Sequence, residues 1–144
     1  MDELTDLYQE IILAHNRRPQ NEGALEPCNF QAEGFNPLCG DRITVYAKRN
    51  DEGVLSPVHF LGEGCAISRA SASMMTVRLS GSTIAEAETK IEQVVDLLTA
   101  AEEPEAELDV LGDLAALIGV RRFPARIKCA TLAWHALRSA LRNE

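Results

Sequence analysis

Three cysteines that lie far apart in the chain each stand beside a predicted break in secondary structure, and one belongs to a Cys-Gly-Asp tripeptide. They are Cys39, Cys65 and Cys129, and the aspartate of the tripeptide is Asp41. Thiolates and carboxylates are metal donors, and three thiolates with one carboxylate suit a tetrahedral divalent ion, zinc before others. The sequence therefore raises the hypothesis of one metal site that the fold assembles from four residues.

The predicted local setting of each donor favours thiolate chemistry. Gly40 allows the backbone to turn so that Cys39 and Asp41 face the same side. Cys65 follows a Gly-Glu-Gly break and opens a predicted helix, and Cys129 is predicted in the first turn of the last helix. Helix N-termini lower the pKa of a thiol. A carboxylate is unusual in closed structural zinc sites, which favours an exchangeable ligand over a permanent one.

Each of these residues also has a structural interpretation, and spacing alone leaves both open. The cysteines could be separate buried thiols, and Asp41 could be a turn or cap residue. Arg126 and Lys128 add positive charge close to Cys129, but such charges also occur on any solvated first helical turn. Cys28 lies outside any motif and is interpreted as a small buried hydrophobic residue.

Composition predicts one acidic globular domain over residues 1–144. The hydrophobic fraction is 46% and the net charge is -8, and a chain of this length can bury a core without cross-links. The acidic balance argues against a nucleic-acid partner, since phosphate contacts need clustered Lys and Arg. No apolar run predicts a membrane span or a signal peptide, so we expect a cytoplasmic protein. In that compartment four cysteines are not expected to form two structural disulfides.

Hydrophobic periodicity predicts an α+β fold with helices on one face of a small antiparallel sheet. A helix over residues 3–17 precedes a loop over 19–41 that is rich in Pro, Gly and Asn. Alternating apolar residues predict strands at 42–48 and 54–61. Further helices are predicted at 65–79, 84–98, 110–119 and 126–142, with an acidic connector at 101–109.

The helix predicted over 65–79 is unusually rich in Ala and Ser. Small side chains allow such a helix to lie close against a sheet. The spacing predicts a single buried stripe, formed by Ile67, Ala70, Met74 and Val77.

Three segments together resemble the SufU branch of the IscU-like (NifU N-terminal) family of iron–sulfur cluster assembly. They are Asn-Pro-Leu-Cys-Gly-Asp at 36–41, Gly-Cys-Ala-Ile-Ser and its continuation at 64–75, and Arg-Ile-Lys-Cys-Ala and its continuation at 126–134. The similarity runs in order over nearly the whole chain. It implies an IscU/SufU-like α+β fold, with an antiparallel sheet of about three strands and helices packed on one face.

The resemblance also implies the ligand set. In the family the metal is held by the residues that correspond here to Cys39, Asp41, Cys65 and Cys129. The scaffold branch has a His immediately before its third Cys, where this chain has Lys128. The scaffold branch also lacks the stretch from about Glu102 to Arg122. Both departures point to the SufU branch.

The resemblance to SufU implies a zinc-dependent acceptor of persulfide sulfur. Its partner would be a SufS-type cysteine desulfurase, a pyridoxal-phosphate enzyme, and downstream iron–sulfur assembly proteins would receive the sulfur. In the implied mechanism a histidine of the desulfurase replaces Cys39 on zinc, and the freed thiolate attacks the persulfide while Arg126 holds or orients it. The activity would be sulfurtransferase-type acceptance. Two alternatives stay open: a scaffold that builds a [2Fe–2S] cluster on the same donors, and a structural zinc module.

Overall fold

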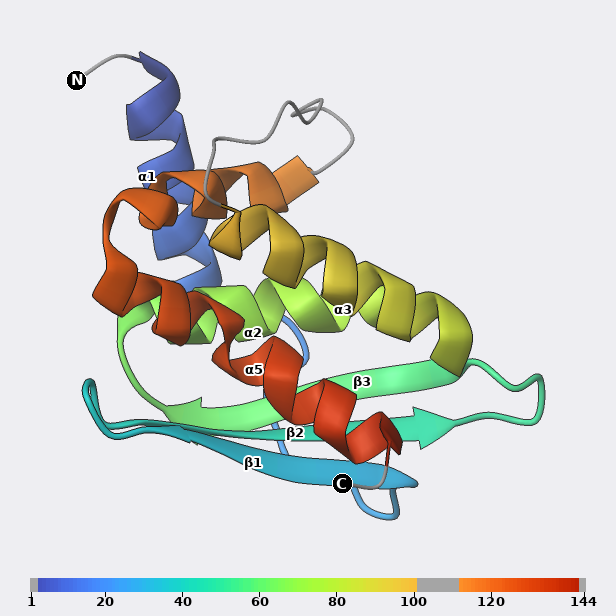
Figure 1. Cartoon of the computed structure of the whole chain (residues 1–144). Helices are drawn as coiled ribbons and strands as arrows, with labels where there is room; N and C mark the ends of the chain where they lie inside the picture. The colour runs from blue at the N-terminus through green and yellow to red at the C-terminus, as the bar shows by residue number, and fades with distance from the viewer. Residues whose placement is uncertain (1–2, 101–111, 143–144) are drawn as a thin grey trace.

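A computed structural model describes residues 3–100 and 112–142 of the chain (Figure 1). The predicted acidic connector at 101–109 lies outside the described residues. The elements, in chain order, are α1 (Glu3–Arg17), β1 (Phe30–Asn36), β2 (Asp41–Arg49), β3 (Leu55–Glu63), α2 (Ala66–Leu79), α3 (Ile84–Thr99), the 3₁₀ helix η1 (Gly112–Arg122) and α5 (Pro124–Arg142).

The three strands form one antiparallel sheet in the order β1-β2-β3, and the helices cover one of its faces (Figure 1). The predicted α+β class is therefore confirmed. Asn36 pairs with Asp41, and Arg42 pairs with Glu63. The β1–β2 turn and the end of β3 consequently meet at the same end of the sheet. Among the described helices, none combines the length and the apolar character that crossing a bilayer requires.

Strand β1 lies inside the segment that the sequence predicts as a loop, so that part of the loop prediction is wrong. Phe30, Ala32 and Gly34 are half-buried and alternate with exposed residues, as in an edge strand. Gly34 serves packing here rather than turning: a Cβ atom on it would lie 3.0 Å from Cδ1 of Leu132 on α5. The glycine therefore allows α5 to approach the sheet closely.

Helix α2 is enclosed on several sides, which corrects the prediction of a single buried stripe. It packs against α1, α5 and β3, and its serines are buried along with its methionines. Val77, predicted in the stripe, is 55% exposed. The buried hydroxyl of Ser71 is paired on both sides: the Trp134 indole donates to its Oγ at 2.8 Å, and the hydroxyl donates to the Ala130 carbonyl. Small residues are thus required because neighbours surround the helix.

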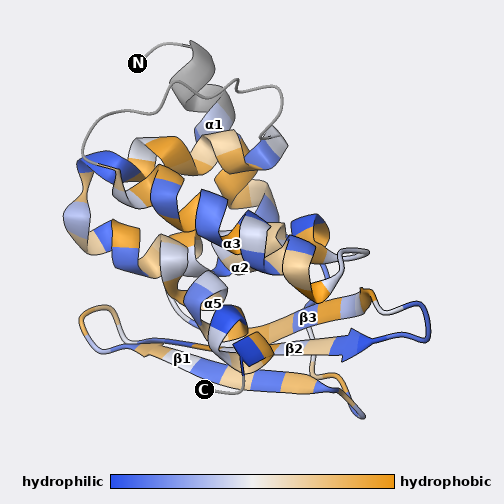
Figure 2. Cartoon of the chain, turned by 45° about the vertical axis from the view of Figure 1, so that its right-hand side comes forward, coloured by the Kyte–Doolittle hydropathy of each residue, from blue (hydrophilic) through white to orange (hydrophobic). Residues whose placement is uncertain are grey.

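The core between the helices and the sheet is mainly aliphatic. In Figure 2 the hydrophobic parts of the helices lie toward one another above the sheet, whereas the turn between β2 and β3 is hydrophilic. The largest fully buried side chains include Trp134, Phe60, Ile43, Leu55 and Met75. Because α5 packs on both β1 and β2, its first turns are held against the end of the sheet.

Two helix boundaries differ from the predictions. A short helix is predicted at 110–119; its described part, from residue 112 on, belongs to the 3₁₀ helix η1, which ends at Arg122, and residues 110–111 lie outside the described residues. Helix α5 begins at Pro124, two residues before its predicted start. Proline fits the first helical position because its missing N–H would have no intrahelical partner there. Cys129 therefore lies in the second turn of α5 rather than the first.

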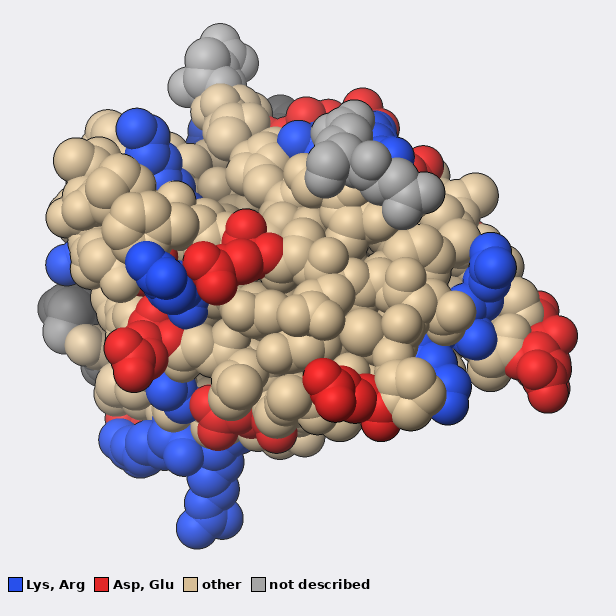
Figure 3. Space-filling view, turned by 90° about the horizontal axis from the view of Figure 1, so that it is seen from below, with Lys and Arg blue, Asp and Glu red and all other residues tan. Residues whose placement is uncertain are grey.

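The outer face of the sheet carries charges of both signs (Figure 3). Arg42 lies 3.6 Å from the carboxylate of Glu33 and stacks over the ring of Phe35, 5.0 Å from its centroid. The basic side chains visible on this face stand apart at its margin rather than in one patch. The end of the sheet beside the β1–β2 turn is therefore electrostatically mixed.

Candidate metal centre

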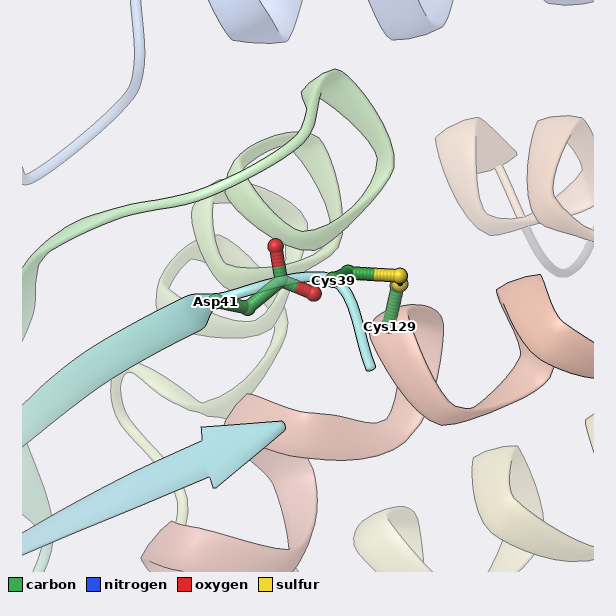
Figure 4. A group of neighbouring side chains, drawn as sticks. All are labelled: Cys39, Asp41 and Cys129. Carbon is green, nitrogen blue, oxygen red and sulfur yellow. Dashed lines mark hydrogen bonds between the residues drawn. The ribbon is translucent and has the colours of Figure 1, made fainter. Parts of the chain in front are cut away.

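Two thiols and one carboxylate meet where the β1–β2 turn reaches α5 (Figure 4). Sγ of Cys39 lies 3.3 Å from Sγ of Cys129. With a carboxylate oxygen of Asp41, these donor atoms all lie within 4.8 Å of one another. The fold thus brings together three of the four donors singled out in the sequence, from segments 90 positions apart.

The β1–β2 turn presents Cys39 at the surface while it buries the next donor. The carbonyl of Asn36 accepts hydrogen bonds from the backbone N–H of Cys39 at 3.3 Å and of Gly40 at 2.8 Å. Gly40 has φ +71°, the left-handed conformation that glycine adopts without strain. The turn places Cys39 in an exposed position and Asp41 in a fully buried one.

Asp41 has one paired and one unpaired carboxylate oxygen. Its Oδ1 accepts the backbone N–H of Cys65 at 2.8 Å. Its Oδ2 is buried and has no hydrogen-bond partner among the described residues. An unpaired buried carboxylate oxygen is costly unless a cation compensates it. A carboxylate with such an oxygen, beside two thiols, fits a thiophilic divalent cation such as zinc.

Cys129 is fully buried, which overturns the expectation of a lowered thiol pKa at a helix start. Burial is the main cause that raises the pKa of the Cys129 thiol well above its usual range, and the neighbouring Asp41, Cys39 and Cys65 raise it further. A coordinated cation reverses this preference, because a metal-bound thiol loses its proton. The Cys129 position therefore favours a thiolate only when a cation is bound.

Cys65 lies beside this group but not within it. It is the N-cap of α2, as its predicted place at a helix start requires, and its Sγ accepts the backbone N–H of Ser68 at 3.5 Å. Its own backbone N–H holds Asp41. Cys65 therefore positions the carboxylate in the structure, and its role as a fourth ligand stays a prediction.

The other residues singled out in the sequence lie around the group. Arg126 and Lys128 are exposed on the first turns of α5, and neither side chain forms an ion pair or hydrogen bond among the described contacts. The role of Arg126 toward Cys39 thus stays a prediction. Cys28 is partly exposed rather than buried and donates to Oε1 of Gln31 at 3.9 Å. Its interpretation as a buried hydrophobic residue is therefore wrong.

The sequence interpretation missed two residues that shape the site. Asn36 looks like a turn residue in the sequence, yet it is 4% exposed and donates from Nδ2 to Sγ of Cys129 at 3.6 Å. Gly64 looks like a strand break, yet a Cβ atom on it would lie 2.5 Å from both Oδ1 of Asp41 and Oγ of Ser68. Both roles depend on contacts between distant segments, so only their position within the motifs offered a signal.

The Gly64→Ala variant is expected to displace the Asp41 carboxylate. The added methyl group overlaps the carboxylate and the Ser68 hydroxyl, and overpacking of this kind costs about 1–3 kcal/mol of unfolding free energy. Chemical denaturation and zinc titration should both report a loss. Gly119→Ala is the matched control, because a Cβ atom there meets nothing within 4 Å. Equal behaviour of the two variants would contradict the assigned role of Gly64.

The model of the family described as the NifU-like N-terminal domain matches residues 7–142 of the chain. The chain belongs to the NifU-like N-terminal domain family. This membership confirms the resemblance derived from the three cysteine segments and accounts for the α+β architecture.

Members of the NifU-like N-terminal domain family with named functions are similar over nearly their whole length. The "Zinc-dependent sulfurtransferase SufU" of Bacillus subtilis (strain 168) is 41% identical, over 98% of this chain and 93% of that protein. The "Iron-sulfur cluster assembly scaffold protein IscU" of Streptococcus pyogenes serotype M1 is 37% identical, over 99% of this chain and 87% of that protein. The names of these two relatives correspond to the two leading hypotheses from the sequence.

The fold also matches solved structures. A crystal structure from Fervidobacterium islandicum AW-1, described as a candidate iron–sulfur cluster assembly scaffold protein for the SUF system, superposes with a TM-score of 0.81. It is 32% identical and covers 92% of this chain and 94% of that one. The predicted IscU/SufU-like fold is therefore confirmed.

Proposed function

We propose that this chain serves iron–sulfur cluster assembly as a zinc-dependent acceptor of persulfide sulfur, with Cys39 as the acceptor. One observation carries the proposal: Cys39 is an exposed residue, and its Sγ lies 3.3 Å from Sγ of the buried Cys129 and next to the Asp41 carboxylate. The site thus places a thiol of an exposed residue next to a thiol and a carboxylate of buried residues. The similarity to a relative named as a zinc-dependent sulfurtransferase supports the same function.

Asp41 and Cys129 are the proposed permanent ligands, because both side chains are fully buried. Cys65, which holds Asp41 through its backbone N–H, is the proposed fourth ligand. Zinc, when bound, keeps its thiol ligands deprotonated and compensates the buried carboxylate. Cys39 is the proposed releasable ligand, since it is an exposed residue of the β1–β2 turn.

The proposed reaction is a thiol–disulfide type of exchange. The Cys39 thiolate attacks the outer sulfur of a persulfide on the partner, a SufS-type cysteine desulfurase. A new S–S bond forms on Cys39, the S–S bond of the partner's persulfide breaks, and the partner's cysteine leaves as a thiolate. No net oxidation or reduction occurs. Arg126, at the exposed start of α5, is the proposed cation that orients the Cys39 thiolate. The proposed location is the cytoplasm, where reducing conditions keep thiols free.

A scaffold function is the second candidate, because the same donors suit iron and a similar relative is named as a cluster assembly scaffold. On this alternative the cluster would rest on Cys39, Asp41, Cys65 and Cys129. Lys128 stands immediately before Cys129, in place of the histidine that the resemblance implies for the scaffold branch. Sulfur acceptance is therefore the better-supported function.

The test is metal analysis of the purified protein together with desulfurase activity in its presence and absence. Sulfur acceptance predicts about one zinc ion per chain, a colourless protein and faster sulfur turnover by the desulfurase. A scaffold predicts a coloured protein after anaerobic reconstitution with iron and sulfide, with a cluster that an apo acceptor can take up. A zinc-loaded chain with no effect on any desulfurase tested would refute sulfur acceptance and favour a structural zinc module.

A further inference from the structure

Asn36 contacts both halves of the site at once. It is the last residue of β1, opposite Asp41, and is 4% exposed. Its Nδ2 donates to Sγ of Cys129 at 3.6 Å, and its Oδ1 accepts the backbone N–H of Leu38 at 3.3 Å. Its backbone carbonyl accepts the N–H groups of the two residues that precede Asp41. One buried side chain thus joins the turn to α5.

The orientation of the Asn36 amide follows from its partners. The backbone N–H of Leu38 can only donate, so the side-chain atom that faces it is the oxygen. The NH₂ group must then face Cys129. A thiolate accepts such a bond more strongly than a thiol does, because the acceptor is charged. The amide is therefore arranged to fix the position of the Cys129 sulfur.

We propose that Asn36 is a positioning residue of the metal centre. Its side-chain NH₂ group fixes the Cys129 thiolate, and its side-chain Oδ1 fixes the turn that carries Cys39. Groups that hydrogen-bond to metal ligands orient them, and their loss typically lowers metal affinity about 10–100-fold. This proposal rests on the zinc-binding part of the proposed function and is independent of sulfur transfer.

Two substitutions separate the contact with Cys129 from the contact with the turn. Asn36→Ala removes both side-chain contacts. Asn36→Asp retains an oxygen for the N–H of Leu38, but it replaces the donor to Cys129 with a second oxygen and adds a negative charge. If Asn36 shaped only the turn, the Asp variant would lose stability through its buried charge but would bind zinc no more weakly than the Ala variant. If the amide supports the thiolate, the Asp variant is the worse of the two.

The experiment measures zinc affinity by competition with a chromophoric chelator, and the absorption spectrum of the cobalt-loaded proteins. We expect Asn36→Ala to bind zinc about 10–100-fold more weakly, with the thiolate-to-cobalt charge-transfer band at longer wavelength, and Asn36→Asp to bind still more weakly. Asn50→Asp is the matched control. Asn50 also accepts backbone N–H groups in a turn, but at the opposite end of β2 from Asp41.

Wild-type affinity in Asn36→Asp, or an unchanged cobalt band in both Asn36 variants, would overturn the proposal. If the Asp variant does not fold, Asn36→Ser takes its place, since a serine hydroxyl supports the same turn but is too short to reach Cys129. A wild-type protein that binds zinc but accepts no sulfur would refute the proposed function. The zinc affinities of the Asn36 variants would still decide whether Asn36 positions the metal centre. A wild-type protein that binds no zinc would overturn both.

Discussion

Replacing Cys39 by serine is expected to abolish sulfur acceptance while the fold survives. The serine hydroxyl cannot serve as the thiolate that attacks a persulfide. Cys39 is exposed on a turn, and substitutions at such positions usually change the unfolding free energy by no more than about 0.5 kcal/mol. Desulfurase turnover with the variant should fall to the rate of the desulfurase alone, and mass spectrometry should detect no added sulfur on the chain.

Cys28→Ser is the matched control for that experiment. Cys28 lies outside the group of donors, and its thiol donates a hydrogen bond to Gln31, so the variant should accept sulfur at the wild-type rate. Sulfur found on Cys39→Ser in wild-type amount would transfer the acceptor role to another cysteine. A large loss of stability in Cys39→Ser would instead favour a structural metal module, because structural zinc contributes directly to folding.

Replacing Asp41 by asparagine is expected to act in opposite directions on stability and on metal binding. Oδ2 of Asp41 is buried without a partner among the described residues, so the metal-free chain carries the cost of an uncompensated polar group. Asparagine removes the charge and retains an oxygen for the N–H of Cys65. The unfolding free energy of the metal-free protein should rise by about 1 kcal/mol or more, whereas zinc affinity should fall by at least about 100-fold.

Denaturation of the metal-free protein and zinc competition measure the two effects. Asp51→Asn is the control, because Asp51 is exposed in the β2–β3 turn, and it should change neither quantity. A less stable metal-free Asp41→Asn protein would show that the carboxylate is a structural group. Unchanged zinc affinity in that variant would exclude Asp41 from the ligand set.

Much of the fold could be predicted because local patterns agree with the tertiary structure. The alternation of Ile43, Val45 and Ala47 places these residues in the core, where all three are fully buried. The glycine between Cys39 and Asp41 has the left-handed backbone that the tripeptide requires. Both features depend on residues close in sequence, and local rules cover them well.

The errors arise where distant contacts decide. Glycine is typical of loops, but Gly34 pairs with Ile43 in the sheet and lies against Leu132 of α5. Val77 follows the helical spacing of the core, but the side chain is 55% exposed. Cys129 is predicted in the first turn of the last helix but lies in the second turn, because α5 begins at Pro124 and not after it.

The candidate site shows the same division. The identity of the donors followed from residue type and motif, and three of them meet as expected. The side-chain direction of Cys65 could not be predicted in this way. Its sulfur accepts the backbone N–H of Ser68 in the helix that Cys65 caps. The supporting roles of Asn36 and Gly64 arise from contacts across the fold, and no local rule identifies them.

The separation of 90 positions between the touching thiols has a consequence for quality control in the cell. Bringing the two thiols together in a disordered chain costs conformational entropy, because so long a loop must close. In the folded protein the thiols are already adjacent, so metal binding does not carry this cost. Nascent, truncated or damaged copies would therefore fail to capture the ion. Under the proposed function, only correctly folded molecules would then bind the metal and take part in sulfur transfer.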